Sequence, residues 1–362
     1  MPAWRRLFWS ALLLLLLLLV WPPCFPARTA PGTVTVVTVD ARNSTWRDFS
    51  RFQDAGKGTQ VDGMSELKRY FSRFGYLPAA VSDFTDVFDD DFESAVVAFQ
   101  TNLGLDVTGE LNAETISAVM SPRCGVGDTP VDGAQPLRRY AYFPGRPRWD
   151  RAEPATLSYA LSPQYTVGYL SQEDVRAVFR RSFARWSAVI PVSFVEAVEY
   201  RKADIRIGFY RGDHGDGQPF DGVLGVLAHA FSPEDGRVHF DAAETWALDF
   251  KREKAKVAID LESVATHEIG HVLGLGHSSV REAVMYPRVN PRTRKVDLRI
   301  DDVEGVQALY GSNPNFRLSS LLESESENNG GVRGGGGLER RWFAWSTWLV
   351  ALVVDLMLPL WL

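Results

Sequence analysis

Six histidines lie between positions 214 and 277 of this 362-residue chain, and the last three stand in one short segment. His267 and His271 are four residues apart, so a helix would place both imidazoles on one face. Glu268 lies beside the first ring, where its carboxylate could take a proton from a water molecule. Gly274 can adopt the left-handed conformation that ends a helix, which would let the chain bring His277 back to the same point. Three imidazoles that leave a fourth position open are typical of a catalytic zinc site.

The other three histidines lie in a stretch rich in carboxylates, residues 214–244. His239 and Asp241 alternate within a strand-like run, so their side chains face the same way. Three imidazoles and one carboxylate could form a closed tetrahedral metal site, while carboxylates with loop carbonyls suit calcium. Composition alone leaves the alternative open that these are unrelated surface histidines and a solvated acidic face.

Two folded regions would position these groups. Apolar residues recur at spacings of three and four between 63 and 120, which predicts a small three-helix domain whose third helix begins at Asn112. In the second region Ser171 can cap a long amphipathic helix, and further helices are expected at 261–273 and 300–310. Strand-like runs occur at 157–161, 192–195, 205–209, 226–231 and 238–240. We therefore expect an α+β protein.

The first 27 residues have the layout of a secretory signal peptide. Arg5 and Arg6 precede an unbroken leucine run at 12–19, and small residues follow. This run is too short to span a membrane comfortably, although a retained anchor is the alternative. Passage through the secretory pathway would make the sequon at Asn43 an N-glycosylation site.

The last residues, 342–362, form a second apolar block. A small-residue site at Asn329, a polar spacer and an apolar tail are together typical of a glycosylphosphatidylinositol (GPI) signal, which is removed. A transmembrane helix is the alternative, but it would tolerate Asp355 poorly. The stretch 313–341, rich in Ser, Glu, Asn and Gly, is expected to be a flexible stalk.

The net charge and the cysteine content indicate which kinds of partner and which cysteine chemistry to expect. The net charge of −6 gives no indication of nucleic-acid binding. Of the two cysteines, Cys24 would leave with the signal peptide, so Cys124 would stand alone. An odd cysteine in a secreted chain suggests a free thiol with a function. The Pro-, Gly- and Arg-rich residues 129–148 after it are expected to form an exposed linker.

The segment 267–277 resembles the zinc signature of the metzincin metalloproteases. Met285 lies in a segment similar to their Met-turn, which implies a position beneath the zinc. Ser278 is similar to the residue that matrixins have after the third histidine, and 122–128 resembles the matrixin cysteine switch. Over about residues 60–312 the chain is identified as a member of the matrixins, or matrix metalloproteinases, and looks most like the plant type without a hemopexin domain.

This resemblance implies a metzincin catalytic domain at 149–312, with a twisted mixed five-stranded sheet and three helices. It implies that residues 28–128 are a propeptide whose three-helix part is similar to peptidoglycan-binding domains. The implied cofactors are a catalytic zinc, a structural zinc and calcium. The implied structural zinc ligands are His214, Asp216, His229 and His239. The implied calcium ligands are Asp221, Gly222, Leu224, Val226, Asp241 and Glu244, although Ala242 stands where relatives often have an acidic residue.

A matrixin would hydrolyse peptide bonds in extracellular proteins, with Glu268 as the general base. In the zymogen the Cys124 sulfur would take the open zinc position, while Arg123 and Asp128 pair to hold its loop. Removal of the chain before about residue 140 would free the site. Ser263 would form the floor of the pocket for the residue after the scissile bond, leaving room for Leu, Ile, Met or Phe. The alternative is that Ser263 only packs within its helix.

The expected partners are extended segments of extracellular protein, lying along the strand at 226–231, and proteinaceous metalloprotease inhibitors. A GPI anchor would place the enzyme on the outer face of the plasma membrane, in the extracellular matrix or apoplast. An alternative assignment is an astacin- or adamalysin-like protease, but Ser278 and Cys124 disfavour it. A catalytically inactive zinc-binding adhesion or peptidoglycan-binding protein is another, against which Glu268 argues.

Overall fold

The computed structural model of the protein describes residues 49–79, 83–128 and 140–319, all within one compact unit, Val39–Leu362. The expected signal peptide, Asn43, Asn329, the terminal apolar block and the stalk from residue 320 onward lie outside the described residues. The predicted start of the stalk at residue 313 is wrong, because the Asn313 side chain donates to the Ser187 carbonyl at 2.7 Å and Phe316 packs against the core. Among the residues that are described, no helix is long and apolar enough to cross a membrane.

The N-terminal part of the described chain is a small helical domain. It consists of a short 3-10 turn, η1 (Ser50–Phe52), and three helices, α2 (Met64–Arg73), α3 (Asp90–Asn102) and α4 (Ala113–Met120). Asp89 and Asn112 cap α3 and α4 by accepting the backbone N–H groups of Phe92 and Thr115. Buried aromatic rings such as Phe71 fill the core between the helices. The predicted three-helix domain is therefore confirmed.

The second region is built on a mixed sheet. Its own strands are β3 (Ala155–Leu161), β4 (Val192–Glu196), β5 (Ile205–Tyr210), β6 (Val226–Ala230) and β7 (Arg237–Asp241). They follow the order β6-β7-β5-β3-β4, in which only β6 and β7 are antiparallel. A sixth strand, β1 (Arg123–Cys124), joins the β6 edge from the segment after the helical domain, in parallel orientation. The expected five-stranded mixed sheet is present, with this strand added to it.

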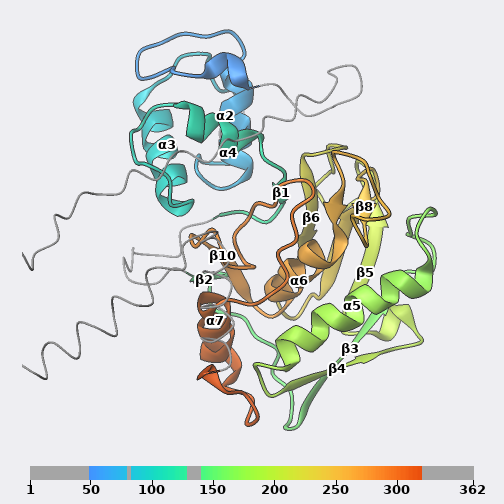
Figure 1. Ribbon diagram of the computed structural model, residues 1–362. Helices are drawn as coiled ribbons and strands as arrows, with labels where there is room; N and C mark the ends of the chain where they lie inside the picture. The colour runs from blue at the N-terminus through green and yellow to red at the C-terminus, as the bar shows by residue number, and fades with distance from the viewer. Residues whose placement is uncertain (1–48, 80–82, 129–139, 320–362) are drawn as a thin grey trace, which may run out of the picture. The chain divides into compact units, whose positions relative to one another are not determined.

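Three helices accompany the sheet, as expected: α5 (Gln172–Ser187), α6 (Leu261–Val272) and α7 (Ile300–Tyr310). Helices α5 and α6 lie along one face of the sheet (Figure 1) and are joined by the Trp186 indole, which donates to the Thr266 carbonyl at 2.9 Å. Ser171 caps α5 by accepting the Asp174 N–H. Two small ladders complete the fold, β8 (Trp246–Ala247) with β9 (Ile259–Asp260) and β10 (Leu275–Ser278) with β2 (Tyr140–Tyr142).

The linker assignment is wrong for residues 140–148. Strand β2 pairs antiparallel with β10, directly after the zinc-signature helix. The Tyr142 ring is buried in the core of the sheet domain, and the Arg148 guanidinium donates to the Leu309 carbonyl at 2.8 Å. The two tyrosines of β2 supply a short apolar strand that the neighbouring Pro, Gly and Arg residues concealed. This sheet domain therefore begins at least as early as Tyr140.

Candidate active site

The turn after α6 brings three histidines together. Helix α6 ends at Val272, and Gly274 follows with a φ of 102°. A Cβ atom at Gly274 would lie 2.2 Å from the Pro147 carbonyl oxygen, so the turn requires glycine. Strand β10 then returns the chain past the helix. As a result the Nε2 atom of His271 lies 3.1 Å from that of His267 and 3.2 Å from that of His277.

The other ring nitrogen of each histidine has a partner that fixes the tautomer. Nδ1 of His267 lies 2.7 Å from the Val284 carbonyl, and Nδ1 of His271 lies 2.8 Å from the Leu275 carbonyl. Both Nδ1 atoms must therefore carry the proton, which leaves Nε2 as a lone pair. Burial lowers the pKa of both rings well below the usual value, so they are neutral. Lone pairs that face one another at 3.1 Å repel unless a cation lies between them.

Cys124 supplies a fourth atom to this cluster. Its Sγ lies 3.3 Å from Nε2 of His271, and one atom from each of the four residues lies within 4.8 Å of the others. Nitrogen ligands at normal zinc distance stand about 3.3 Å apart around a tetrahedron, close to the spacing observed here. The donor set of three imidazoles and one thiol fits zinc. Burial, with the Glu268 carboxylate beside it, raises the pKa of the Cys124 thiol, and metal coordination is what favours its thiolate.

Glu268 is fully buried beside these groups. Neither of its carboxylate oxygens has a hydrogen-bond partner among the described residues. Burial raises the pKa of Glu268 to about 8. Buried carboxylates are normally hydrogen-bonded, because leaving one without a partner costs free energy. A carboxylate that is held without a partner and next to the histidine cluster is available to exchange a proton with a molecule that enters the site.

Arg123 and Asp128 form the expected pair, with Nη2 and Oδ1 2.7 Å apart and both side chains buried. The sequence did not indicate a second contact of the same carboxylate, which lies 2.6 Å from Nδ1 of His277. Although burial acts in the opposite direction, Arg123 and then His277 hold the pKa of Asp128 far below its usual range. Asp128 thus links the Cys124 loop to the third histidine.

The segment around Met285 packs against the helix that carries His267 and His271. Met285 is buried against Gly270 of α6, where an added Cβ atom would lie 2.2 Å from the methionine sulfur. The buried Asp302 carboxylate accepts the backbone N–H groups of Val284 and Met285, each at 2.9 Å. Asp302 was not identified from the sequence, although two adjacent acidic residues at the start of a helix were visible there. It fixes the turn whose Val284 carbonyl orients His267.

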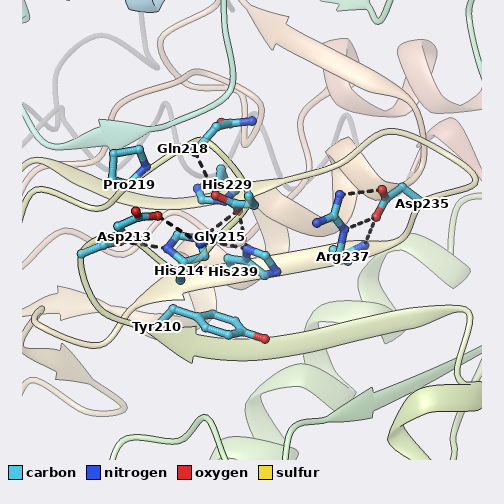
Figure 2. A network of polar contacts seen from close by, with 12 residues as sticks. Tyr210, Asp213, His214, Gly215, Gln218, Pro219, His229, Asp235, Arg237 and His239 are labelled. Atoms are coloured by element: carbon cyan, nitrogen blue, oxygen red, sulfur yellow. Dashed lines mark hydrogen bonds and ion pairs between the residues drawn. The ribbon is translucent and has the colours of Figure 1, made fainter.

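His214, His229, His239 and Asp216 converge in a second cluster. Figure 2 shows the three histidines turned toward one another, from a loop and from strands β6 and β7. Oδ2 of Asp216 lies 2.8 Å from one ring nitrogen of each histidine. Nδ1 of His214 lies 2.9 Å from the Gly212 carbonyl, so a neutral ring would present only a lone pair to Asp216. Burial lowers the pKa of His229 and His239 to about 4, so these rings are neutral and fit a zinc ion.

The six residues expected to bind calcium also lie together, but less tightly than the residues of the two histidine clusters. Asp221, Asp241 and Glu244 accept backbone N–H groups of the loop, from Val226, Gly222 and Leu224 respectively. Burial raises the pKa of Asp241 to about 6 and that of Glu244 well above its usual value, and Oε2 of Glu244 has no partner among the described residues. In the described part of the chain, only the two histidine clusters bring three or more ligand atoms within 4.8 Å of one another.

A cavity opens beside Glu268 at the point predicted for the specificity pocket. Its lining includes Leu227, Ser263, Val264, Tyr286, Val289 and Lys295. The Ser263 hydroxyl donates to Asp260 at 2.6 Å and accepts the Lys295 N–H at 2.7 Å, so it lines the cavity and also belongs to the helix cap. The sequence did not indicate Lys295, whose ammonium donates to the carbonyls of Arg281 and Ala283.

Comparisons with known proteins agree with this geometry. Residues 148–311 match the family model described as Matrixin, and residues 60–119 match the one described as Putative peptidoglycan binding domain. The chain is 52% identical over 332 residues to Metalloendoproteinase 1-MMP of Arabidopsis thaliana, covering 89% of this chain and 90% of that protein. It is 57% identical over 268 residues to Metalloendoproteinase 4-MMP of the same plant, covering 73% and 77%. Interstitial collagenase of Sus scrofa is 42% identical over 219 residues, 60% and 42% of the two chains.

The sheet domain, the histidine cluster and these matches define a metalloprotease of the metzincin type. The chain belongs to the matrixin family, and the similarity to the plant members without a hemopexin domain is confirmed. It is a zinc metalloendopeptidase, and protein substrates are what such an enzyme acts on. Matrixins use a catalytic zinc, a structural zinc and calcium.

Proposed function

We propose that the chain is the latent precursor of an extracellular endopeptidase, with a catalytic zinc held by His267, His271 and His277. The observation that carries the proposal is the set of three Nε2 lone pairs spaced at 3.1 and 3.2 Å beside the unpartnered Glu268 carboxylate. Bound zinc supplies a Lewis acid that polarises a carbonyl group and makes water more acidic.

The chain's own groups then perform the proton transfers. Glu268 takes a proton from the attacking water molecule and delivers it to the leaving amine, which needs no covalent enzyme intermediate. The Val284 and Leu275 carbonyls hold two of the imidazoles in the tautomer that leaves Nε2 free. Met285, held by Asp302, supports the cluster from below. An extended substrate lies along the edge of β6, where the backbone can pair with it.

Latency follows from the position of the Cys124 segment. Its backbone occupies the β6 edge: the Arg123 N–H donates to the Gly225 carbonyl at 3.0 Å and the Gly125 N–H to the Ala228 carbonyl at 2.7 Å. The Cys124 sulfur reaches the histidines, so one short segment covers both the metal position and the substrate edge. Cleavage of the chain before about residue 140 would release it. The zymogen would therefore be inactive until the propeptide is removed.

The second cluster, His214, Asp216, His229 and His239, would hold a structural zinc, because all four positions are taken by side chains. Asp221, Asp241 and Glu244, with loop oxygens near Gly222, Leu224 and Val226, would hold calcium; the buried and unpartnered Glu244 oxygen supports a cation there.

The cavity beside Glu268 would accept the side chain after the scissile bond. Leu227, Val264 and Val289 give it apolar walls, so burying a Leu-sized side chain could contribute about 1.5–3 kcal/mol. We expect cleavage-site profiling of the activated enzyme on a peptide library to find Leu, Ile, Met or Phe at this position. A Ser263→Arg variant should shift the ranking toward smaller residues. A wild-type preference for Ala, Gly or acidic residues there would refute the apolar pocket.

Anchoring through a GPI lipid near Asn329 rests on the sequence pattern alone, as do the signal peptide, the Asn43 glycan and the stalk. We expect phosphatidylinositol-specific phospholipase C to release the protein from the outer face of cells that express the full chain. The measurement is immunodetection in the supernatant with and without the phospholipase. Protein that stays with the membrane after this treatment would indicate a transmembrane helix instead.

A further inference from the structure

Arg288 lies in the chain segment that forms the second wall of the cleft, facing β6. The Cys124 N–H donates to the Pro287 carbonyl at 2.9 Å, and the Val289 N–H donates to the Pro122 carbonyl at 3.3 Å. The propeptide segment is therefore an extended peptide held between β6 and this wall. Arg123 stands directly opposite Arg288 in an antiparallel bridge. Opposite residues carry their side chains on the same face, so a peptide held in this cleft brings one side chain beside Arg288.

The helical domain covers the Arg288 guanidinium. Nε donates to the Ala118 carbonyl at 2.6 Å, Nη2 donates to the Tyr70 hydroxyl at 3.0 Å, and the guanidinium carbon lies 5.0 Å from the centre of the Phe99 ring. Nη1 is buried and has no hydrogen-bond partner among the described residues. No carboxylate in the described part of the chain forms an ion pair with Arg288. Removal of the propeptide would therefore expose a cation that lacks a counter-ion.

Two further arginines follow Arg288 in the chain, although neither lines the cavity. Arg292 donates only to carbonyl oxygens, those of Phe250, Glu253 and Ala255. Arg294 pairs with Glu262, but that carboxylate is shared with Arg181 and Arg185. By contrast, the peptide in the cleft brings its own counter-ion for Arg123, namely Asp128. The segment 288–295 thus carries basic residues and no acidic ones, and Arg288 is the arginine of this segment that lines the cleft.

We propose that Arg288 selects acidic side chains at the second or third position after the scissile bond. The inference rests on the proposed endopeptidase function and adds a substrate class, extended segments with Asp or Glu shortly after the cut. The first side chain after the cut enters the cavity, whose lining includes Arg288, whereas the hydrogen bonds of the guanidinium are made with the helical domain. Once that domain leaves, the planar guanidinium can form a bidentate pair with a carboxylate.

The test uses the full-length chain activated by limited proteolysis, and peptides with Leu directly after the cut. Glu, Gln or Lys is placed at the second or the third position, and kcat/KM is measured for each peptide. At one of these positions we expect Glu to exceed Gln about fivefold and Lys by more, with the ratio shrinking as salt is raised. Arg288→Gln should remove the preference, and Arg288→Lys should keep part of it.

Arg252→Gln is the matched control, because it removes the same charge from an exposed residue whose side chain is not part of the cleft wall. It should leave the ranking unchanged. Equal rates for Glu, Gln and Lys in the wild type would overturn the inference without any variant. So would a preference that survives in Arg288→Gln, or one that Arg252→Gln removes equally. Failure to cleave any peptide would instead sink the proposed endopeptidase function.

Discussion

Replacing Glu268 with Ala is expected to lower kcat/KM by about 10²–10⁴-fold while the zinc content of the protein stays unchanged. The carboxylate lies beside the histidine cluster, but it is not one of the four groups whose ligand atoms converge there. Its oxygens have no partner among the described residues, so its removal breaks no hydrogen bond that stabilises the fold. The activity loss should therefore come from the missing base alone.

Two measurements, the zinc content by elemental analysis and the melting temperature, distinguish the loss of the catalytic base from a loss of zinc or of folded protein. Glu268→Gln is the matched control, because it keeps the volume and removes the base; it should lose activity to a similar extent. Near-normal turnover of Glu268→Ala with zinc retained would show that another group serves as the base.

Cys124→Ser is expected to give an uncleaved chain at least about tenfold more active than the wild-type precursor, since a hydroxyl is a far poorer zinc ligand than a thiolate. The other contacts of this segment, the Arg123–Asp128 pair and the pairing with β6, do not involve the sulfur. The segment should still dock, but water could now enter the position beside His271. Peptide hydrolysis by the uncleaved chain is the measurement.

Self-cleavage would complicate that assay, so the double variant Cys124→Ser with Glu268→Ala provides the control. It should remain full-length on a gel while Cys124→Ser shortens with time. A Cys124→Ser precursor as latent as the wild type would mean that the covering segment blocks the cleft without any help from the thiol.

Much of the fold and the histidine cluster could be predicted from residue spacing and helix caps, which depend only on neighbouring residues in the sequence. The spacing of His267 and His271, with Gly274 at the helix end, placed three rings correctly because helix geometry is repetitive and only glycine fits that turn. Asn112 and Ser171 marked helix starts because a cap bonds to a backbone group three residues away.

Contacts between distant parts of the chain were not accessible in this way. The Asp128 and His277 side chains meet across 149 positions, and Arg288 reaches Ala118 across 170. Asp302 accepts backbone N–H groups of the Met-turn. Almost every residue has such a group, so the amino-acid sequence does not indicate this contact. Strand β2 was missed because three residues are too few to show alternation among prolines and arginines.

Hydrolysis of casein by the activated wild-type chain, before and after removal of metal with a chelator, tests the central claim most directly. We expect hydrolysis to stop on chelation and to return when zinc is added back with calcium present. Hydrolysis that continues at the same rate after zinc has been shown by elemental analysis to be absent would contradict the assignment of His267, His271 and His277 as the metal centre of this peptidase.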